Sequence, residues 1–200
     1  MSQPHLTFRD ATAADIPALL ALIQSAYRGE ASRKGWTTEA DLVEGERIDE
    51  PGLLEKISEP NGVVMVVTVE GTDDVVSCCE FLHRSGASSS STTTETTTEK
   101  QQQVGYFGLF AVDPNRQAGG IGRRVLEHAE REAARRWGVT TMEMTVIAAR
   151  ADIIAWYERR GYAQSTTEPT RPFPHEMVAR MRGGRVLRDD LHFVVLEKAL

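Results

Sequence analysis

A glycine-rich turn between an apolar run and an amphipathic run constrains the fold of this chain more than any other feature. The apolar run, Tyr106 to Val112, predicts a strand. The run from Ile121 to Trp137 predicts a helix, because its apolar residues recur at helical spacing on one face. Backbone N–H groups at the start of a helix lack partners inside it, and the helix dipole adds partial positive charge there. The turn therefore predicts an anion site, for which phosphate is the usual ligand.

Two common phosphate-binding loops do not fit this turn. A Walker loop ends in Gly-Lys-Ser/Thr, but here Gly122 is followed by Arg123 and Arg124. A Rossmann turn needs a third small residue three positions after its second glycine, and Val125 stands there instead. No acidic residue closes a following strand at the expected distance either. The ligand is therefore expected to belong to another phosphate-containing class.

Three segments of the chain carry a family resemblance. The run Gln117-Ala118-Gly119-Gly120-Ile121-Gly122 resembles the Gln/Arg-x-x-Gly-x-Gly/Ala signature of the GNAT superfamily of acyl-CoA-dependent N-acetyltransferases. Leu109 to Pro114 is similar to the fourth strand of that family, and Ile154 to Tyr162 to its Tyr-Glu-x-x-Gly-Phe/Tyr segment. The three segments lie in the family's order and spacing over Val104 to Tyr162. If the glycines only permitted a tight turn, the presence of the similar segment Ile154 to Tyr162 at the family's spacing would have no explanation.

The resemblance implies a fold and a co-substrate. The fold class is α/β (α+β), with a central mixed, mostly antiparallel twisted sheet that is splayed around acetyl-CoA and flanked by helices on both faces. Main-chain N–H groups from Ala118 to Arg123 would hold the CoA pyrophosphate, and the strand at Phe110 to Val112 would pair with the pantetheine arm. The break in the sheet would lie between that strand and Met142 to Ile147. The implied acetyl-CoA contacts are Phe110, Ala111, Val112, Gln117, Ala118, Gly119, Gly120, Ile121, Gly122, Arg123, Arg124, Arg150 and Tyr157.

The resemblance also assigns a general acid. Tyr157 matches the family tyrosine that protonates the departing thiolate, and a phenol with its pKa near 10 is protonated at neutral pH. Packing in the core is the alternative role of this residue. Many relatives carry Asn seven positions before the tyrosine and Ala four before it, where this chain has Arg150 and Ile153. Arg150 as a contact to CoA is therefore a departure from the family pattern.

The acceptor amine needs to lose a proton. An alkyl ammonium has a pKa near 10.4, so only about one molecule in a thousand is neutral at pH 7.4, a handicap of about 4 kcal/mol. Relatives often use a glutamate on the splayed strands as the base. Glu80 and Glu143 are the candidates here, although each can also be an ordinary sheet residue. An amine of low pKa would need no base.

Substrate contacts are expected from three parts of the chain: the segment 27–36, the strand near Tyr106, and the C-terminal tail. An aspartate there can pair with a substrate ammonium, and Arg171 with a carboxylate. The aromatic residues can form walls or a small satellite core. The candidates are Tyr27, Trp36, Tyr106, Arg171, Phe173, Asp189 and Asp190.

The predicted activity is transfer of acetyl from acetyl-CoA to a primary amine of a small molecule, by direct attack. Neither Cys78 nor Cys79 has a His or a helix terminus nearby in sequence to activate it, so no acyl-enzyme is expected. One alternative is a protein N-terminal or lysine acetyltransferase. A non-enzymatic alternative is a CoA-binding regulatory module. The family's habits also allow a homodimer, which these residues do not decide.

Composition limits the domain number, the partners and the location that can be expected for this chain. The chain has 200 residues, 40% of them hydrophobic, which suits a single domain over 1–200. A net charge of -6 argues against nucleic acid as a partner. No apolar run is long enough for a bilayer and no secretory leader is recognisable, so we expect no membrane partner and a cytoplasmic location. No metal-ligand spacing occurs, and the adjacent cysteines should point to opposite faces of one strand.

Periodicity and turn residues predict the remaining elements. Strands are expected at 6–9, 63–69, 75–82, 140–147 and 191–197, and helices at 16–27, 39–46, 53–57 and 151–159, with a capping box over 12–15. The segment 84–103 is rich in Ser, Thr and Gln and predicts a flexible low-complexity insert between two antiparallel strands. The segment 166–188 predicts a long excursion before the last strand.

Overall fold

The computed structural model describes residues 4–84 and 103–200. Its strands are β1 (Leu6–Asp10), β2 (Val43–Glu44), β3 (Gly62–Val69), β4 (Val75–Arg84), β5 (Val104–Val112), β6 (Thr141–Ile147), β7 (Ala163–Gln164), β8 (Thr170–Pro172), β9 (Arg185–Val186) and β10 (His192–Ala199). Its helices are α1 (Ile16–Tyr27), α2 (Gly29–Ser32), α3 (Glu50–Ile57), α4 (Ile121–Trp137), α5 (Ala151–Glu158) and α6 (His175–Arg180), with 3-10 turns η1 (Ala13–Asp15) and η2 (Pro114–Arg116).

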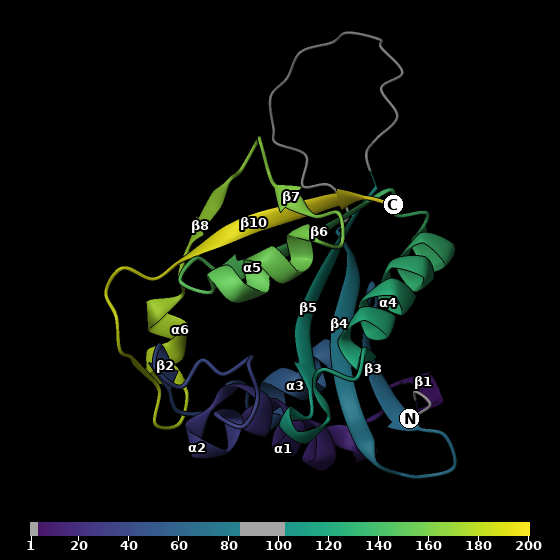
Figure 1. Ribbon diagram of the computed structural model, residues 1–200, viewed down its shortest axis with the longest axis horizontal. Coiled ribbons are helices and arrows are strands. Elements are labelled where there is room, and N and C mark those ends of the chain that lie inside the picture. The colour runs from purple at the N-terminus through teal and green to yellow at the C-terminus, as the bar shows by residue number, and fades with distance from the viewer. Residues whose placement is uncertain (1–3, 85–102) are drawn as a thin grey trace, which may run out of the picture.

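The main sheet is mixed and splits in its middle. Its strand order is β1-β3-β4-β5-β6-β10-β7, with β8 on β10, and within the described residues β5–β6 is its one parallel pair. These two strands pair only where residues 104–106 of β5 face residues 141–143 of β6. Beyond that point β6 and β10 turn away from β5 (Figure 1). The predicted fold class is confirmed, and the split lies where the resemblance implied it.

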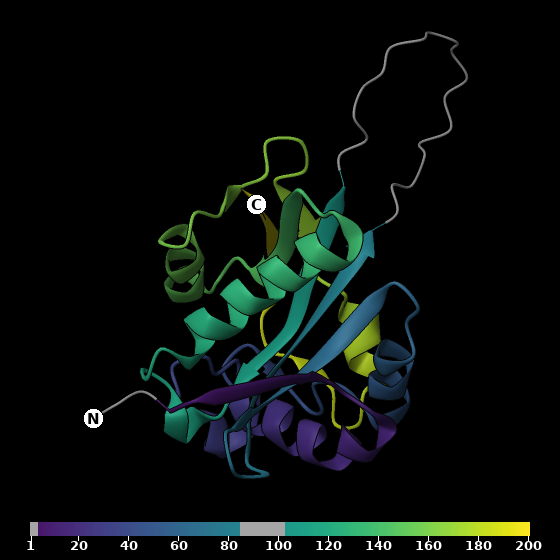
Figure 2. The same ribbon diagram turned by 90° about the vertical axis from the view of Figure 1, so that its right-hand side faces the viewer.

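Helices cover both faces of the sheet. Side chains alternate along a strand, so Val63, Met65 and Val67 of β3 pack toward α4 and α5, while Val64 and Val66 pack toward α1 and α3. Figure 2 shows α4 on one side of the strands and α1 on the other. The adjacent cysteines follow the same rule, since Cys78 lies in the α1 layer and Cys79 in the α4 layer. Both are free and buried.

The first helix begins as its sequence indicates. The Asp15 carboxylate accepts a hydrogen bond from the Thr12 backbone N–H at 2.8 Å, which confirms the capping box. Arg9 of β1 donates two further hydrogen bonds to the same carboxylate, at 2.8 and 2.6 Å. These hydrogen bonds with the Arg9 guanidinium hold the pKa of Asp15 well below its usual range. The contact ties the sheet edge to the start of α1.

The predicted helix over 39–46 is wrong. The chain turns there and contributes β2, which pairs with β9 through Val43–Val186 and Glu44–Arg185. Tertiary contacts override local helix propensity in this segment, because Leu42 and Val43 are buried in a small core with Phe173 and Val178. This core joins the segment after α2 to the predicted excursion of the tail, which contains β8, α6 and β9.

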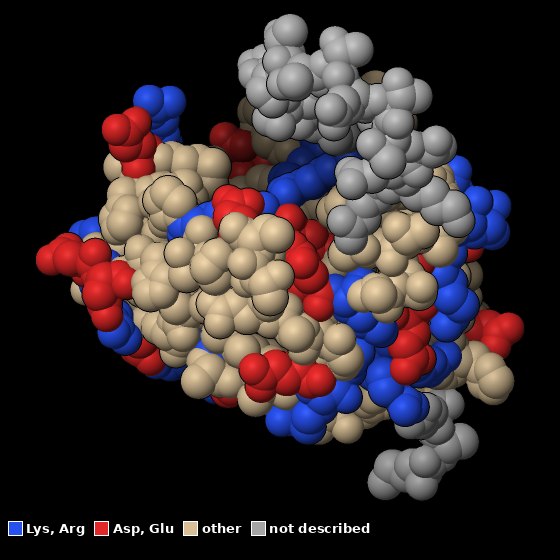
Figure 3. All heavy atoms as spheres, turned by 90° about the horizontal axis from the view of Figure 1, so that it is seen from above, with Lys and Arg blue, Asp and Glu red and all other residues tan. Residues whose placement is uncertain are grey.

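The predicted insert connects two neighbouring strands. Arg84 at the end of β4 faces Val104 at the start of β5 in an antiparallel pair. Residues 85–102, over which the low-complexity insert was predicted, lie outside the described residues. On the face seen in Figure 3, basic and acidic side chains are interspersed, unlike the continuous basic stripe of many nucleic-acid-binding surfaces. None of the helices in the described parts of the chain is long and apolar enough to cross a bilayer.

Candidate active site

The glycine-rich turn presents backbone donors at the start of α4. Gly120 is the N-cap with φ 78°, and Ala118 also lies in the left-handed region with φ 65°. The first helical hydrogen bond runs from the Arg124 N–H to the Gly120 carbonyl at 3.3 Å. Among the described residues, no acceptor faces the N–H groups of residues 118–123. These unpaired donors and the helix dipole form the geometry that binds phosphate groups.

A cavity of about 310 Å³ opens beside this turn. Its walls come from the end of α1, the segment after α2, the end of β5, the turn, the start of α4, and α5 with the residues just after it. Nine predicted acetyl-CoA contacts line it: Phe110, Val112, Gln117, Ala118, Gly120, Ile121, Gly122, Arg123 and Tyr157. The structure therefore brings most of the predicted donor-binding residues together around one space.

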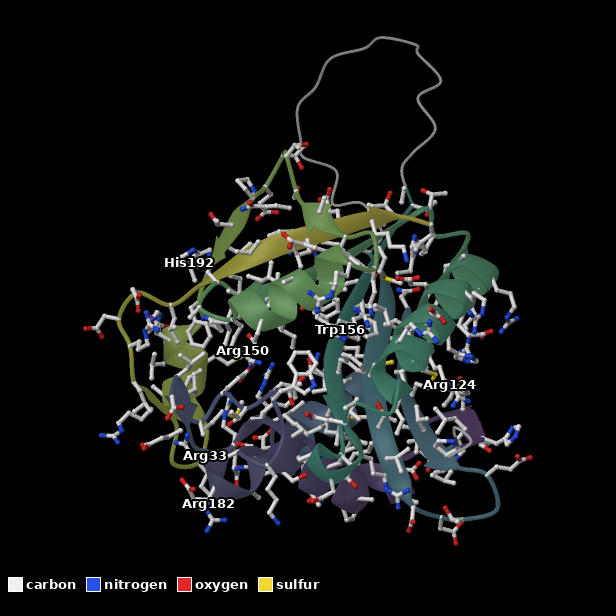
Figure 4. The ribbon with its side chains drawn as sticks, viewed as in Figure 1. Arg33, Arg124, Arg150, Trp156, Arg182 and His192 are labelled. Atoms are coloured by element: carbon white, nitrogen blue, oxygen red, sulfur yellow. The ribbon has the colours of Figure 1, made fainter. Side chains whose placement is uncertain are left out.

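Four predicted acetyl-CoA contacts lie outside this lining. Ala111 is buried in the layer under α1, and Gly119 is exposed to solvent. Arg124 donates to the Pro4 carbonyl at 2.6 Å and lies on the outer side of α4, away from Trp156 (Figure 4). Arg150 binds the carbonyls of residues 36–38 and the carboxylate of Asp152.

The Gln117 side chain fastens two walls of this cavity together. Its Oε1 accepts a hydrogen bond from the Trp36 N–H at 2.9 Å, and its Nε2 donates to the Thr37 hydroxyl at 2.9 Å and to the Val112 carbonyl at 3.2 Å. A Cβ on Gly35 would lie 2.7 Å from the Gln117 Oε1. The signature glutamine thus makes its contacts with protein atoms and shapes the cavity.

Sequence reasoning missed Arg160. Its Cζ lies 3.5 Å from the centroid of the Trp156 ring, and both residues line the cavity. The Arg160 Nε is buried and has no hydrogen-bond partner among the described residues. Burial lowers the pKa of Arg160, and the positive charges of Arg159 and Arg123 lower it further. It stands three residues after Tyr157, just beyond the end of α5 at Glu158, and this closeness in sequence is the signal that could have indicated it.

A second cavity of about 610 Å³ adjoins the first. It lies in the split between β5 and β6, and the segments 39–59 and 174–181 contribute to its walls. The residues that line both cavities are Tyr27, Phe110, Ile153 and Tyr157. A molecule in one cavity can therefore meet a molecule in the other beside the Tyr157 ring.

The Tyr157 hydroxyl is available at this junction. The residue is 5% exposed, and its ring packs edge-on against Trp156 and Tyr162, with centroid distances of 5.0 and 5.8 Å. Its hydroxyl makes no hydrogen bond with any residue that the structure describes. Burial raises the pKa of Tyr157 well above its ordinary value, with a smaller contribution from Tyr27. The hydroxyl therefore stays protonated at neutral pH and can donate to a ligand.

A bulge in β5 shapes the junction. The pairing of β4 with β5 shifts between Cys78 and Glu80, and Leu109 has φ 45°. The Tyr27 hydroxyl donates to the Phe110 carbonyl. Ser77 donates in the same way to the Ala111 carbonyl at 2.6 Å. Side chains from α1 and β4 thus hold this part of β5 in place at the split.

The structure separates the two candidate bases. Glu80 is 3% exposed, lines the second cavity and receives hydrogen bonds from Lys56 Nζ at 2.9 and 2.8 Å. Glu143 does not line either cavity, and both its oxygens accept hydrogen bonds from Arg171, at 2.6 and 3.0 Å. Arg84 also donates to Glu143 at 2.5 Å. Of the two, only Glu80 faces one of these cavities.

The predicted substrate contacts also fall into two groups, those that line one of the cavities and those that do not. Tyr27 and Tyr106 line the second cavity, and Trp36, which is 41% exposed, lines the first. The other four are placed elsewhere. Arg171 is held by Glu143 and Glu168, Phe173 is buried in the small core, and Asp189 and Asp190 are exposed, with Asp190 paired to Arg188.

Comparisons with known proteins agree with this geometry. A family model described as "Acetyltransferase (GNAT) family" matches residues 18–162. The chain is 45% identical over 56 residues to the [ribosomal protein bS18]-alanine N-acetyltransferase of Escherichia coli K12, which is 28% of this chain and 37% of that relative. The matched part thus spans little more than a third of the curated relative.

Solved structures share the fold. The crystal structure of the ribosomal-protein-S18-alanine N-acetyltransferase from Escherichia coli is similar with a TM-score of 0.59 and 18% identity, over 98% of this chain and 94% of that one. The N-acetylglutamate synthase from Neisseria gonorrhoeae, solved in complex with coenzyme A and N-acetyl-glutamate, is similar with a TM-score of 0.57 and 19% identity. That second likeness covers 100% of this chain and 36% of the other.

Proposed function

The chain belongs to the GNAT family of acetyltransferases, and we propose that it transfers the acetyl group of acetyl-CoA to the primary amine of a small molecule. One observation carries this proposal. Two cavities meet at a buried tyrosine whose hydroxyl has no partner among the described residues, and one of them opens beside a row of unpaired backbone donors. A donor and an acceptor could occupy the two spaces and react at Tyr157.

The first cavity is proposed to bind the donor. Its diphosphate would accept hydrogen bonds from the N–H groups of residues 118–123. Arg123 and Arg160 would add positive charge, and Arg160 has a buried Nε without a partner among the described residues. The apolar rings of Phe110 and Trp156 would contact the uncharged arm of the donor.

The proposed chemistry is direct attack. The acceptor nitrogen forms a bond to the thioester carbonyl carbon, and the carbon–sulfur bond breaks. The Tyr157 hydroxyl donates its proton to the departing sulfur and recovers a proton from solvent. The nitrogen loses its proton to Glu80, directly or through one water. The Lys56 ammonium donates hydrogen bonds to both Glu80 oxygens, at 2.9 and 2.8 Å, which holds the carboxylate in place in the wall of the second cavity.

The dimensions of the second cavity support a small acceptor. A volume of about 610 Å³ is typical of small-molecule sites. Its outer wall includes two segments that β2 and β9 hold together. Acetylation of a protein N-terminus is the rival, and the names of the similar ribosomal-protein-alanine acetyltransferases favour it. The two free cysteines support a reducing compartment, for which the cytoplasm is proposed.

The test is an assay of CoA release over a panel of small amines and short peptides, with acetyl-CoA binding measured by calorimetry. Turnover of small amines above peptides is expected. Turnover of peptides alone would replace the proposal by the protein-acetylating activity. Tight acetyl-CoA binding without turnover of any acceptor would instead indicate a CoA-binding regulatory module.

A further inference from the structure

Arg47 is an arginine of the second cavity whose side chain makes no hydrogen bond with any residue that the structure describes. Its Nε is shielded from solvent and has no hydrogen-bond partner among the described residues. The nearest acidic oxygen is Oε2 of Glu39 at 3.7 Å, and that oxygen already accepts a hydrogen bond from Arg28. The other arginine in this lining, Arg150, is fully occupied by three carbonyls and Asp152.

The charges of this wall do not balance. Within the part of the chain that the structure describes, Arg28 and Arg47 share Glu39 as their one carboxylate, which leaves one positive charge at Arg47. Elsewhere in the cavity, Lys56 is neutralised by Glu80. The remaining acidic residues of the lining, Glu55 and Glu59, are exposed on and just after α3, where water screens them. An anion bound at Arg47 would neutralise the excess charge.

Arg47 also lies close to the junction of the two cavities. Its Cζ is 5.5 Å from the centroid of the Tyr27 ring. Tyr27 lines both cavities, and its hydroxyl donates to the Phe110 carbonyl at the junction. The Tyr27 ring therefore lies between the guanidinium and the place where an acceptor nitrogen would meet the thioester. Only a short molecule can place its nitrogen there and an anionic group on Arg47.

The rest of the cavity offers apolar surface. Leu82 of β4, Met144 and Val146 of β6, Met177 of α6 and Phe193 of β10 all contribute to the lining. These five side chains come from four elements and would surround an uncharged group of the acceptor. The cavity thus combines a single unneutralised guanidinium with an extensive apolar wall.

On the basis of the proposed acetyl transfer, we propose that the acceptor is a free amino acid with an apolar side chain, and that Arg47 binds its carboxylate. A guanidinium can hold a carboxylate through two parallel hydrogen bonds. In an amino acid the amine and the carboxylate share one carbon, which matches the short distance from Arg47 to the junction. A peptide N-terminus has no carboxylate in that position, so Arg47 would also select against proteins.

The test compares free methionine, leucine and phenylalanine with their carboxamides, which differ only at the group that would contact Arg47. CoA release is measured with the full-length enzyme, with Arg47→Gln and with Arg188→Gln as the matched control. Arg188 is an exposed arginine whose side chain donates two hydrogen bonds to Asp190, at 2.9 and 2.6 Å. Melting curves of all three proteins establish that the variants fold.

The wild type is expected to prefer the acids over the amides by 10- to 100-fold in kcat/KM, as for loss of a hydrogen bond to a charged group. Arg47→Gln should lower kcat/KM for the acids by a similar factor and change that for the amides less than twofold, while Arg188→Gln should resemble the wild type. The amide amines are the less basic ones, which favours the amides, so amine ionisation cannot produce this preference.

Two results would overturn the inference. The first is that the acids and the amides are turned over equally well, or that only amines that lack a carboxylate are turned over. The other is an Arg47→Gln variant that loses the same factor on both substrate sets. In either case the proposed acetyl transfer stands, because an amine is still acetylated. Failure of every amine and peptide in the earlier panel would instead remove the proposed function, and this inference with it.

Discussion

The Tyr157→Phe variant tests the proposed chemistry with little disturbance of the fold. The substitution removes one hydroxyl and keeps the ring, so the edge-on contacts with Trp156 and Tyr162 remain. Because the hydroxyl has no hydrogen-bond partner among the described residues, its loss leaves no protein group unpaired. The free energy of unfolding should therefore change by less than about 1 kcal/mol.

The expected effect on catalysis is much larger. Loss of a positioned general acid lowers kcat by about 10²- to 10⁴-fold. The Kd of acetyl-CoA should stay within about twofold of the wild-type value, since the proposed phosphate contacts lie at the turn and at Arg160. Burial raises the pKa of Tyr157 well above its ordinary value, so the wild-type hydroxyl stays protonated across the neutral range and should not itself cause a fall in kcat there.

Tyr162→Phe is the matched control. The Tyr162 hydroxyl donates to Glu130 Oε1 at 2.9 Å, and Lys198 donates to the other Glu130 oxygen at 2.7 Å. Removing the Tyr162 hydroxyl leaves a buried carboxylate short of one donor, which should cost about 1.5–3 kcal/mol of stability. The two variants should therefore differ in what they lose. Tyr162→Phe should lose mainly stability, and Tyr157→Phe should lose mainly activity.

The assay combines steady-state CoA release, calorimetry with acetyl-CoA and urea denaturation on both variants. A Tyr157→Phe enzyme with wild-type kcat would refute the role of the hydroxyl as the acid. A Tyr157→Phe protein destabilised as much as Tyr162→Phe would refute the inference that the Tyr157 hydroxyl is unpaired.

Three further predictions concern stability and reactivity. Gly45→Ala should lower the free energy of unfolding, measured by urea denaturation, by at least about 1 kcal/mol, because Gly45 has φ 89° and an added Cβ would lie 2.5 Å from the Gly183 backbone. A variant as stable as the wild type would contradict this. The Arg135 guanidinium lowers the pKa of Glu132 to about 2, so Glu132→Gln should lower the free energy of unfolding by about 0.5 kcal/mol above pH 5. This difference in stability from the wild type should vanish as the pH falls from about 4 to 2. A difference that grows on acidification would contradict the prediction. Burial raises the pKa of Cys78 to about 12, so a thiol reagent should label the cysteines only after denaturation, and fast labelling of native protein would show that the core opens.

Local patterns were sufficient for much of the framework. The helix Ile121–Trp137 was predicted with the bounds it has, because its apolar stripe and flanking glycines are signals within the segment itself. The same holds for the helix Ile16–Tyr27 with its capping box, and for the two cysteines on opposite faces. The turn at Gly120 was predicted as an anion site for the same reason, and the structure shows its N–H groups without acceptors among the described residues.

The partners of charged side chains depend on segments far apart in the chain. Nothing near Arg171 in sequence indicates that Glu143 will occupy it, and nothing near Arg47 indicates that it will lack a hydrogen-bond partner among the described residues. The helix predicted over 39–46 failed for a similar reason, because β9 supplies a strand partner from residues 185–186. Periodicity and turn chemistry act within a few residues, so the sequence by itself determined most of the helices and strands and the glycine-rich turn before α4. Ion pairing and burial act between distant residues, so only the tertiary structure decided that Glu80 rather than Glu143 lines the second cavity, together with Arg47.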